Sequence, residues 1–121
     1  MWRRSKEWEP EALIASMVAR NQLLWAALQD AGVTEQTELR LDFFYESAGS
    51  TGDAQLADLL RRETDYDVQI QDGGKKGYGV TGTTQPTAVD LATLNEWVTW
   101  MVRAGRENGN CKFDGWGAAV P

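Results

Sequence analysis

Apolar residues recur every three or four positions from residue 10 to about residue 31. Pro10 suits the first turn of a helix, and Glu11 is favourable near the positive end of the helix dipole. Gly32 supplies a stop. The pattern predicts one long amphipathic helix, with an apolar stripe made of Leu13, Ile14, Met17, Val18, Leu24, Trp25 and Leu28.

From residue 37 to residue 45 the period changes to two, which is typical of a strand covered on one side. One face carries Leu39, Leu41, Phe43 and Tyr45, and the other carries Arg40, Asp42, Phe44 and Glu46. A small-residue loop follows, in which Ser50 or Thr51 is expected to cap a second helix that runs through about Thr64. Its inward residues are predicted to be Leu56, Leu59 and Leu60.

Residues 66–71 alternate again, with Tyr66, Val68 and Ile70 on the predicted inner side. The segment Asp72-Gly73-Gly74-Lys75-Lys76-Gly77 predicts a hairpin turn, after which residues 78–84 return as a third strand. The Gly-Gly-Lys-Lys run lacks the strand, loop and helix context of a phosphate-binding loop. We therefore interpret it as a hairpin tip.

Asp90 is a natural N-cap for a third helix, and Gly109 is its expected stop. The predicted inward stripe consists of Leu91, Leu94, Trp97, Val98, Trp100, Met101 and Val102. Residues 110–114 alternate between polar and apolar side chains and predict the last strand.

The element order is therefore one helix followed by βαββαβ. We predict an α+β fold of the ferredoxin-like, split βαβ kind, in which two helices cover one face of a four-stranded antiparallel sheet. A chain of 121 residues has the size of a single domain. Within it, residues 1–20 form an N-terminal helical extension, and residues 21–120 form the main unit.

The segment from Phe113 to Gly117 is the most distinctive motif, because two glycines flank a tryptophan. We interpret it as a turn in which Asp114 accepts backbone N–H bonds. Trp116 then fills the end of the core, or it belongs to a partner-binding surface.

The composition excludes several kinds of catalytic site. The chain has no histidine, which removes histidine general bases, the Ser-His-Asp and Cys-His nucleophile systems and histidine metal centres. Its single cysteine, Cys111, offers neither an internal disulfide nor a zinc cluster. Asp42, Asp67 and Asp114 are the best remaining acid, base or magnesium candidates, but carboxylates on an open strand face are usually just solvated. We expect no enzyme, no metal site and no cofactor.

The formal net charge is −6 and the pI is about 4.6. This balance argues against direct nucleic-acid binding and favours a basic partner. The opening Met1-Trp2-Arg3-Arg4 is followed by polar residues, not by the apolar segment of a signal peptide. The sequence has no apolar run long enough for a membrane span. We expect a cytoplasmic protein with no membrane partner.

From about residue 21 to residue 120 the chain resembles the ribonuclease E inhibitor RraB family, also called regulator of ribonuclease activity B. Five segments of the sequence carry the resemblance. They are Leu24-Trp25-Ala26-Ala27-Leu28 before Ala31-Gly32, the strand from Leu39 to Tyr45, Leu56-Ala57-Asp58-Leu59-Leu60, the Tyr78 strand with Leu91-Ala92-Thr93-Leu94, and Asn108-Gly109 followed by Phe113-Asp114-Gly115-Trp116-Gly117.

The resemblance implies a ferredoxin-like α+β sandwich that binds a ribonuclease E-type endoribonuclease and restrains its cleavage of RNA. The partner-binding candidates are Asp42, Phe44, Asp67, Gln69, Asp114 and Trp116. Two alternatives stay open: an immunity-type inhibitor of another basic nuclease, and a small-ligand-sensing module of the same fold. The sequence leaves the oligomeric state open.

Overall fold

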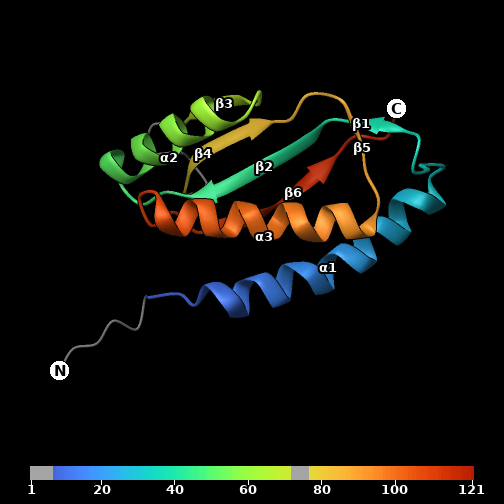
Figure 1. Ribbon diagram of the computed structural model, residues 1–121, viewed down its shortest axis with the longest axis horizontal. Helices are drawn as coiled ribbons and strands as arrows, with labels where there is room; N and C mark the ends of the chain where they lie inside the picture. Colours follow the sequence, from blue (N-terminus) through green and yellow to red (C-terminus); the bar gives the residue numbers. More distant parts are fainter. Residues whose placement is uncertain (1–6, 72–76) are drawn as a thin grey trace.

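The computed structural model describes residues 7–71 and 77–121, and the following statements concern these residues (Figure 1). Met1 to Arg4 and most of the predicted hairpin turn lie outside them. The described chain forms the helices α1 (Pro10–Asp30), α2 (Ser50–Glu63) and α3 (Leu91–Glu107). Its strands are β1 (Glu38–Leu39), β2 (Leu41–Glu46), β3 (Asp67–Ile70), β4 (Tyr78–Thr83), β5 (Thr87–Ala88) and β6 (Phe113–Ala118).

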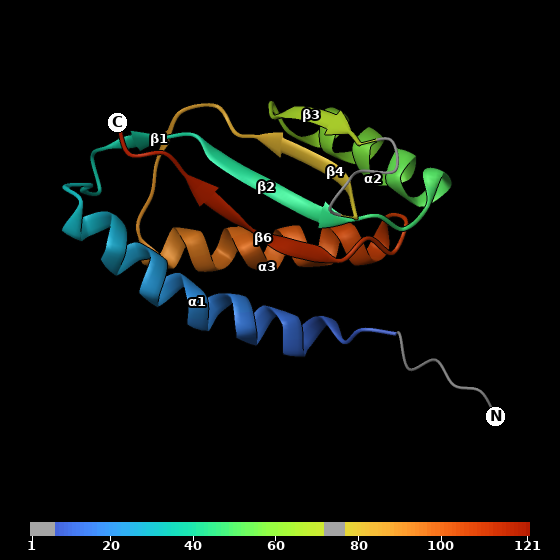
Figure 2. The same cartoon turned by 180° about the vertical axis from the view of Figure 1, so that it is seen from behind.

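The larger sheet has the strand order β3-β4-β2-β6, and all neighbouring strands are antiparallel. Helices α2 and α3 lie on the same side of this sheet (Figures 1 and 2). Alternate residues of the strands therefore pack against the two helices. The fully buried core contains Phe43, Tyr45, Leu56, Leu60, Val80, Leu94, Val98, Met101, Val102 and Phe113. The predicted α+β class is confirmed.

The long N-terminal helix is also confirmed, and α1 continues without a break across residue 20. It runs antiparallel to α3 and lies beside it in both views (Figures 1 and 2). Two salt bridges, each with an N···O distance of 2.9 Å, connect α3 to the N-terminal region: Arg103 pairs with Glu11 on α1, and Arg106 pairs with Glu7, just before α1. They lie where α1 begins and α3 ends.

A polar residue, Asn21, occupies the middle of the buried side of α1. Its Nδ2 donates to Oδ1 of Asn95 at 3.0 Å, and its Oδ1 accepts from Nε1 of Trp116 at 2.9 Å. Buried amides are costly unless they are hydrogen-bonded, so these two bonds fix α1 against both α3 and β6.

The predicted strand over residues 37–45 is two strands, which separate at Arg40. The first part pairs with β5, a strand that the sequence did not predict, and forms a smaller antiparallel sheet. The second part is the central strand β2. The inward positions Leu39 and Leu41 are both buried across the break, which is why the period-two pattern looked continuous.

Four further predictions need correction. The last strand covers residues 113–118, because the glycine-flanked tryptophan pairs with β2 instead of forming a turn. Gly49, with a φ of 91°, is the N-cap of α2 and makes no side-chain hydrogen bond. Trp100 and Ile70, predicted to face inward, are 41% and 44% exposed. Ile70 lies on the edge strand β3, where little covers it.

The ends of α3 match the prediction. Oδ1 of Asp90 accepts the Thr93 N–H at 2.8 Å, and Gly109 follows the helix with a φ of 92°. Of the helices in the described residues, none has the length and apolar character needed to cross a membrane.

Candidate functional site

The side of the larger sheet that faces away from α2 and α3 is not covered by any helix of the described chain (Figure 2). We call its outward residues the open sheet face, and they are Asp42, Phe44, Asp67, Gln69, Tyr78, Thr81, Thr83 and Asp114. Five of the six predicted partner-binding residues are among them. The structure thus brings together side chains from four strands.

Strand register arranges these side chains in cross-strand rows. One row runs from Asp67 through Thr83 to Asp42. The next runs from Gln69 through Thr81 to Phe44. Because paired residues of antiparallel neighbours point to the same face, each row crosses three strands on one surface.

In the first row, the Thr83 hydroxyl donates to Oδ1 of Asp42 at 2.8 Å. Asp67 lies two strands from Asp42, which corresponds to about 10 Å. The two carboxylates are therefore too far apart to share a proton or to chelate one metal ion. They can each pair with a separate cation of a partner.

An aromatic and acidic cluster lies beyond the second row. The ring centroids of Phe44 and Tyr78 are 5.3 Å apart with an interplanar angle of 33°. The Tyr78 hydroxyl donates to Oδ2 of Asp114 at 3.0 Å. This hydrogen bond, followed by burial, raises the pKa of Tyr78 above its ordinary value of 10.0. Asp114 therefore contacts a tyrosine and does not form the predicted Asx turn.

Gly115 and Gly117 form the border of this surface on β6. Gly115 pairs with Phe44 and Gly117 pairs with Asp42. The β6 ladder shifts register between Phe44 and Tyr45, where Asp114 is the additional residue. Gly117 leaves the surface beside Asp42 flat, whereas the buried Gly115 lies next to the Arg20 guanidinium of α1, whose Nη1 is 3.3 Å from a Cβ atom built on this glycine.

The sixth predicted residue, Trp116, lies on the opposite side of the sheet. It is only 7% exposed, and it pairs with the buried Phe43. Its ring centroid is 6.2 Å from that of Trp97 on α3. Of the two interpretations left open by the sequence, the structure supports the core, and Trp116 is removed from the candidate surface.

Asp53 and Cys111 form a buried pair, in which the Cys111 thiol lies 3.8 Å from Oδ1 of Asp53. Burial, followed by the nearby Asp53 charge, raises the pKa of Cys111 to about 12, so the thiol is not a nucleophile near neutral pH. The Asp53 carboxylate accepts from the Ser47 hydroxyl at 2.7 Å and from the Ala48 N–H at 2.9 Å. The pair thus holds the loop before α2 in place.

Sequence reasoning did not include Tyr78, Thr81 and Thr83 in the site. The signal for Thr81 and Thr83 was available in the hairpin, because a register that pairs residue 69 with residue 81 places odd-numbered residues of both strands on one face. Tyr78 reaches that face only through the register shift between β2 and β4. Asn21 was also missed. A polar residue between Met17 and Trp25, on the apolar stripe of a helix, is the corresponding signal.

The resemblance to the RraB family rests on the sequence segments quoted above. No family model matches the chain, and no curated protein matches it.

Proposed function

We propose that the chain is a non-enzymatic regulator that binds a ribonuclease E-type endoribonuclease and slows its cleavage of RNA. It acts in the cytoplasm, through contact with the enzyme and without binding RNA itself. The contact surface is the open sheet face. The client is the one implied by the resemblance to the RraB family.

We also assign the larger sheet and its two covering helices to the ferredoxin-like, split βαβ class. The strand order β3-β4-β2-β6, with α2 after β2 and α3 before β6, supports this assignment. In such a fold one sheet face is covered by helices and the other is available for contact. The assignment therefore agrees with the fold that the resemblance implies.

The observation that carries the proposal is the cluster of Phe44, Tyr78 and Asp114 on the open sheet face. Aromatic faces attract guanidinium groups, and a neighbouring carboxylate can accept their N–H bonds. Arginine matches both features, because its planar head stacks and donates at the same time. RNA-binding segments of a nuclease carry such basic residues in order to hold phosphates.

Gly117 adds a second argument. Its φ is not positive, and a Cβ atom built on it meets nothing within 4 Å. The fold therefore does not require glycine there. A flat strand beside Asp42 leaves room for a partner's backbone to approach closely.

The direct test is a binding titration with the catalytic and scaffold halves of the host enzyme, each measured separately. We expect one half to bind, and we expect the cleavage of long RNA by the intact enzyme to slow. Because charges mainly steer the encounter, the association rate should fall as salt rises beyond about 0.15 M, where the Debye length is about 8 Å. The protein alone should bind no RNA.

Charge variants locate the contact. Asp114→Asn and Asp42→Asn should weaken binding, whereas Asp58→Asn on the exposed side of α2 should not. If neither half binds at micromolar concentration in low salt, the nuclease-regulator proposal is rejected in favour of the immunity-type alternative. Turnover of RNA that disappears in Asp42→Asn or Asp114→Asn would contradict the non-enzymatic assignment.

A further inference from the structure

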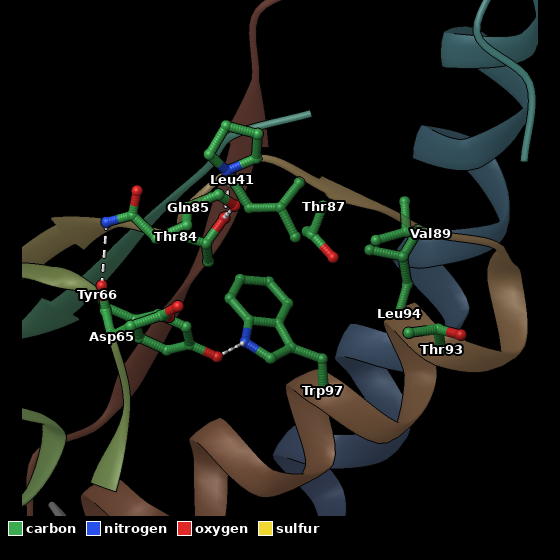
Figure 3. A pocket seen from close by; sticks show the side chains of 11 residues that line it. Leu41, Asp65, Tyr66, Thr84, Gln85, Thr87, Val89, Thr93, Leu94 and Trp97 are labelled. Carbon is green, nitrogen blue, oxygen red and sulfur yellow. Dashed lines mark hydrogen bonds between the residues drawn. The ribbon is translucent and has the colours of Figure 1, made fainter. Parts of the chain in front are cut away.

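A second candidate site lies on the helix side of the larger sheet, away from the open sheet face. A pocket of about 240 Å³ opens between the end of the sheet and the beginning of α3 (Figure 3). Trp97 and Leu94 come from α3, Asp65 and Tyr66 come from the connection between α2 and β3, and Thr87 comes from β5. Its volume is just below the range of about 300 to 1,000 Å³ usual for ligand sites, which suits a small metabolite.

Most polar groups of the pocket wall already have partners. Nε1 of Trp97 donates to the Tyr66 hydroxyl at 3.0 Å. The Thr84 hydroxyl accepts the Leu41 N–H at 3.0 Å and donates to the Gln85 carbonyl, also at 3.0 Å. These bonds hold the walls in place without a ligand. Because the pocket is preformed, binding loses little free energy to the ordering of its walls.

Two polar side chains in the pocket have no such partner. The Asp65 carboxylate and the Thr87 hydroxyl lie at the exposed rim of the pocket, and they make no hydrogen bond or ion pair within residues 7–71 and 77–121. Both point toward the hollow in Figure 3, on either side of the Trp97 ring. The accessible apolar surface of the hollow comes mainly from Pro86 and the Trp97 indole, because Leu41, Val89 and Leu94 behind them are almost completely buried.

The charged groups in and around the pocket indicate whether a ligand should be a cation or an anion. Asp65 is the sole charged side chain among the described residues that line the pocket. Arg40 is not a lining residue, although its guanidinium donates to Oε1 of Gln85, which lines the pocket, at 3.2 Å. The beginning of α3, which would otherwise attract an anion, is already capped by the Asp90 carboxylate.

We propose that this pocket binds a small organic amine with an aromatic or branched hydrocarbon body. The hydrocarbon packs against Pro86 and the Trp97 ring, and the ammonium group pairs with Asp65. The Thr87 hydroxyl accepts a further N–H bond. A ligand held here leaves the open sheet face free, so the inference does not depend on the proposed nuclease client.

The test is an NMR titration of the ¹⁵N-labelled full chain at low salt with 2-phenylethylamine, and separately with 3-phenylpropionate. We expect the amine to shift the Trp97 indole N–H and the backbone N–H groups of residues 84, 85 and 87–89, and the carboxylate to bind about tenfold more weakly. Asp65→Asn should weaken amine binding by about fivefold or more, because it removes the charge and keeps the shape. Asp30→Asn, at the exposed end of α1, is the matched control and should change nothing.

Three outcomes would overturn the inference. One is equal or tighter binding of the carboxylate. The second is unchanged amine affinity in Asp65→Asn. The third is the absence of shifts at residues 84–89 and Trp97 up to about 10 mM amine, since millimolar affinity is the weakest that a built site should give.

Discussion

The two faces of the larger sheet are built from alternating residues of the same strands, but they obey different constraints. Phe43 faces α2 and α3, is fully buried and packs against Tyr45 and Tyr66. Phe44, its neighbour in sequence, lies on the open sheet face beside Tyr78. Packing in the core determines the size and apolar character of the inner residue, Phe43. The outer one covers no core, so its aromatic character is available for a contact outside the chain.

The glycines show the same difference. A Cβ on Gly79 would lie 2.3 to 2.5 Å from the Asp53 carboxylate atoms, and one on Gly82 would lie 2.4 Å from the Phe43 ring. Larger residues at these two positions would require the core to shift. Gly117, in contrast, has open space and an ordinary backbone. Folding thus explains the glycines that touch the core, and a φ of 129° explains Gly115, whereas nothing in the fold requires glycine at Gly117.

Removing Trp116 should have the largest effect on stability. Trp116→Ala should lower the free energy of unfolding by about 3 to 5 kcal/mol, because it opens a cavity and leaves buried Asn21 without its donor. Trp100→Ala is the matched control, at 41% exposure, and should cost about 1 kcal/mol or less. Chemical denaturation measures both. Similar losses of unfolding free energy in the two variants would contradict the placement of Trp116 in the core and Trp100 at the surface.

Adjacent phenylalanines provide the sharpest internal comparison. Phe43→Ala should destabilise the fold by about 3 to 5 kcal/mol. Phe44→Ala should cost only about 1 kcal/mol, the size of a cross-strand aromatic pair, yet it should weaken partner binding. The measurements are denaturation and binding on the same preparations. A Phe44→Ala variant that binds normally would remove the aromatic cluster from the contact.

Tyr78 on the open sheet face and Tyr45 in the core should differ in the pH at which each ionises. The effect on stability should be smaller than in the variants above. The Asp114 hydrogen bond raises the pKa of Tyr78, so its stabilising contribution is present below pH 10 and is lost as the pH rises through the folded-state pKa. Asp114→Asn should move that pKa back toward 10.0. Burial raises the pKa of Tyr45 well above its ordinary value, and its hydroxyl donates to the Met101 carbonyl at 2.7 Å.

Ultraviolet or NMR titration of the phenols follows both residues. Tyr78 should ionise reversibly in the folded protein, whereas Tyr45 should ionise only as the fold is lost. Asp114→Ala removes the acceptor altogether, and an unchanged Tyr78 titration in that variant would exclude the hydrogen bond as the cause of the raised pKa.

Periodicity correctly predicted those elements that the local sequence pattern determines. The three helices, the inner residues of β2 and the Asp90 cap all follow from spacing and capping rules. The pairing of β1 with β5 does not follow from these rules, since both strands are two residues long and each depends on a partner far along the chain. The glycine-flanked tryptophan was misread as a turn for the same reason. Its strand conformation comes from pairing with β2, which lies about seventy residues earlier.

The candidate surface was partly predictable. Alternation along β2 and β3 places Asp42, Phe44, Asp67 and Gln69 on one face. The contact between Tyr78 and Asp114 depends on irregular pairing at both β4 and β6, which spacing does not reveal. The side on which Trp116 lies depends on that same bulge.

The most direct test of the open sheet face as the contact surface is the affinity of Gly117→Val for the half of the host nuclease that binds the wild-type protein. Valine fits the open space and favours strands, so the free energy of unfolding should not fall. Its branched side chain should obstruct the partner and weaken binding by about tenfold or more, equivalent to about 1.4 kcal/mol. Ala92→Val, on the exposed side of α3, is the control and should bind normally. Wild-type affinity in a fully folded Gly117→Val protein would contradict the account.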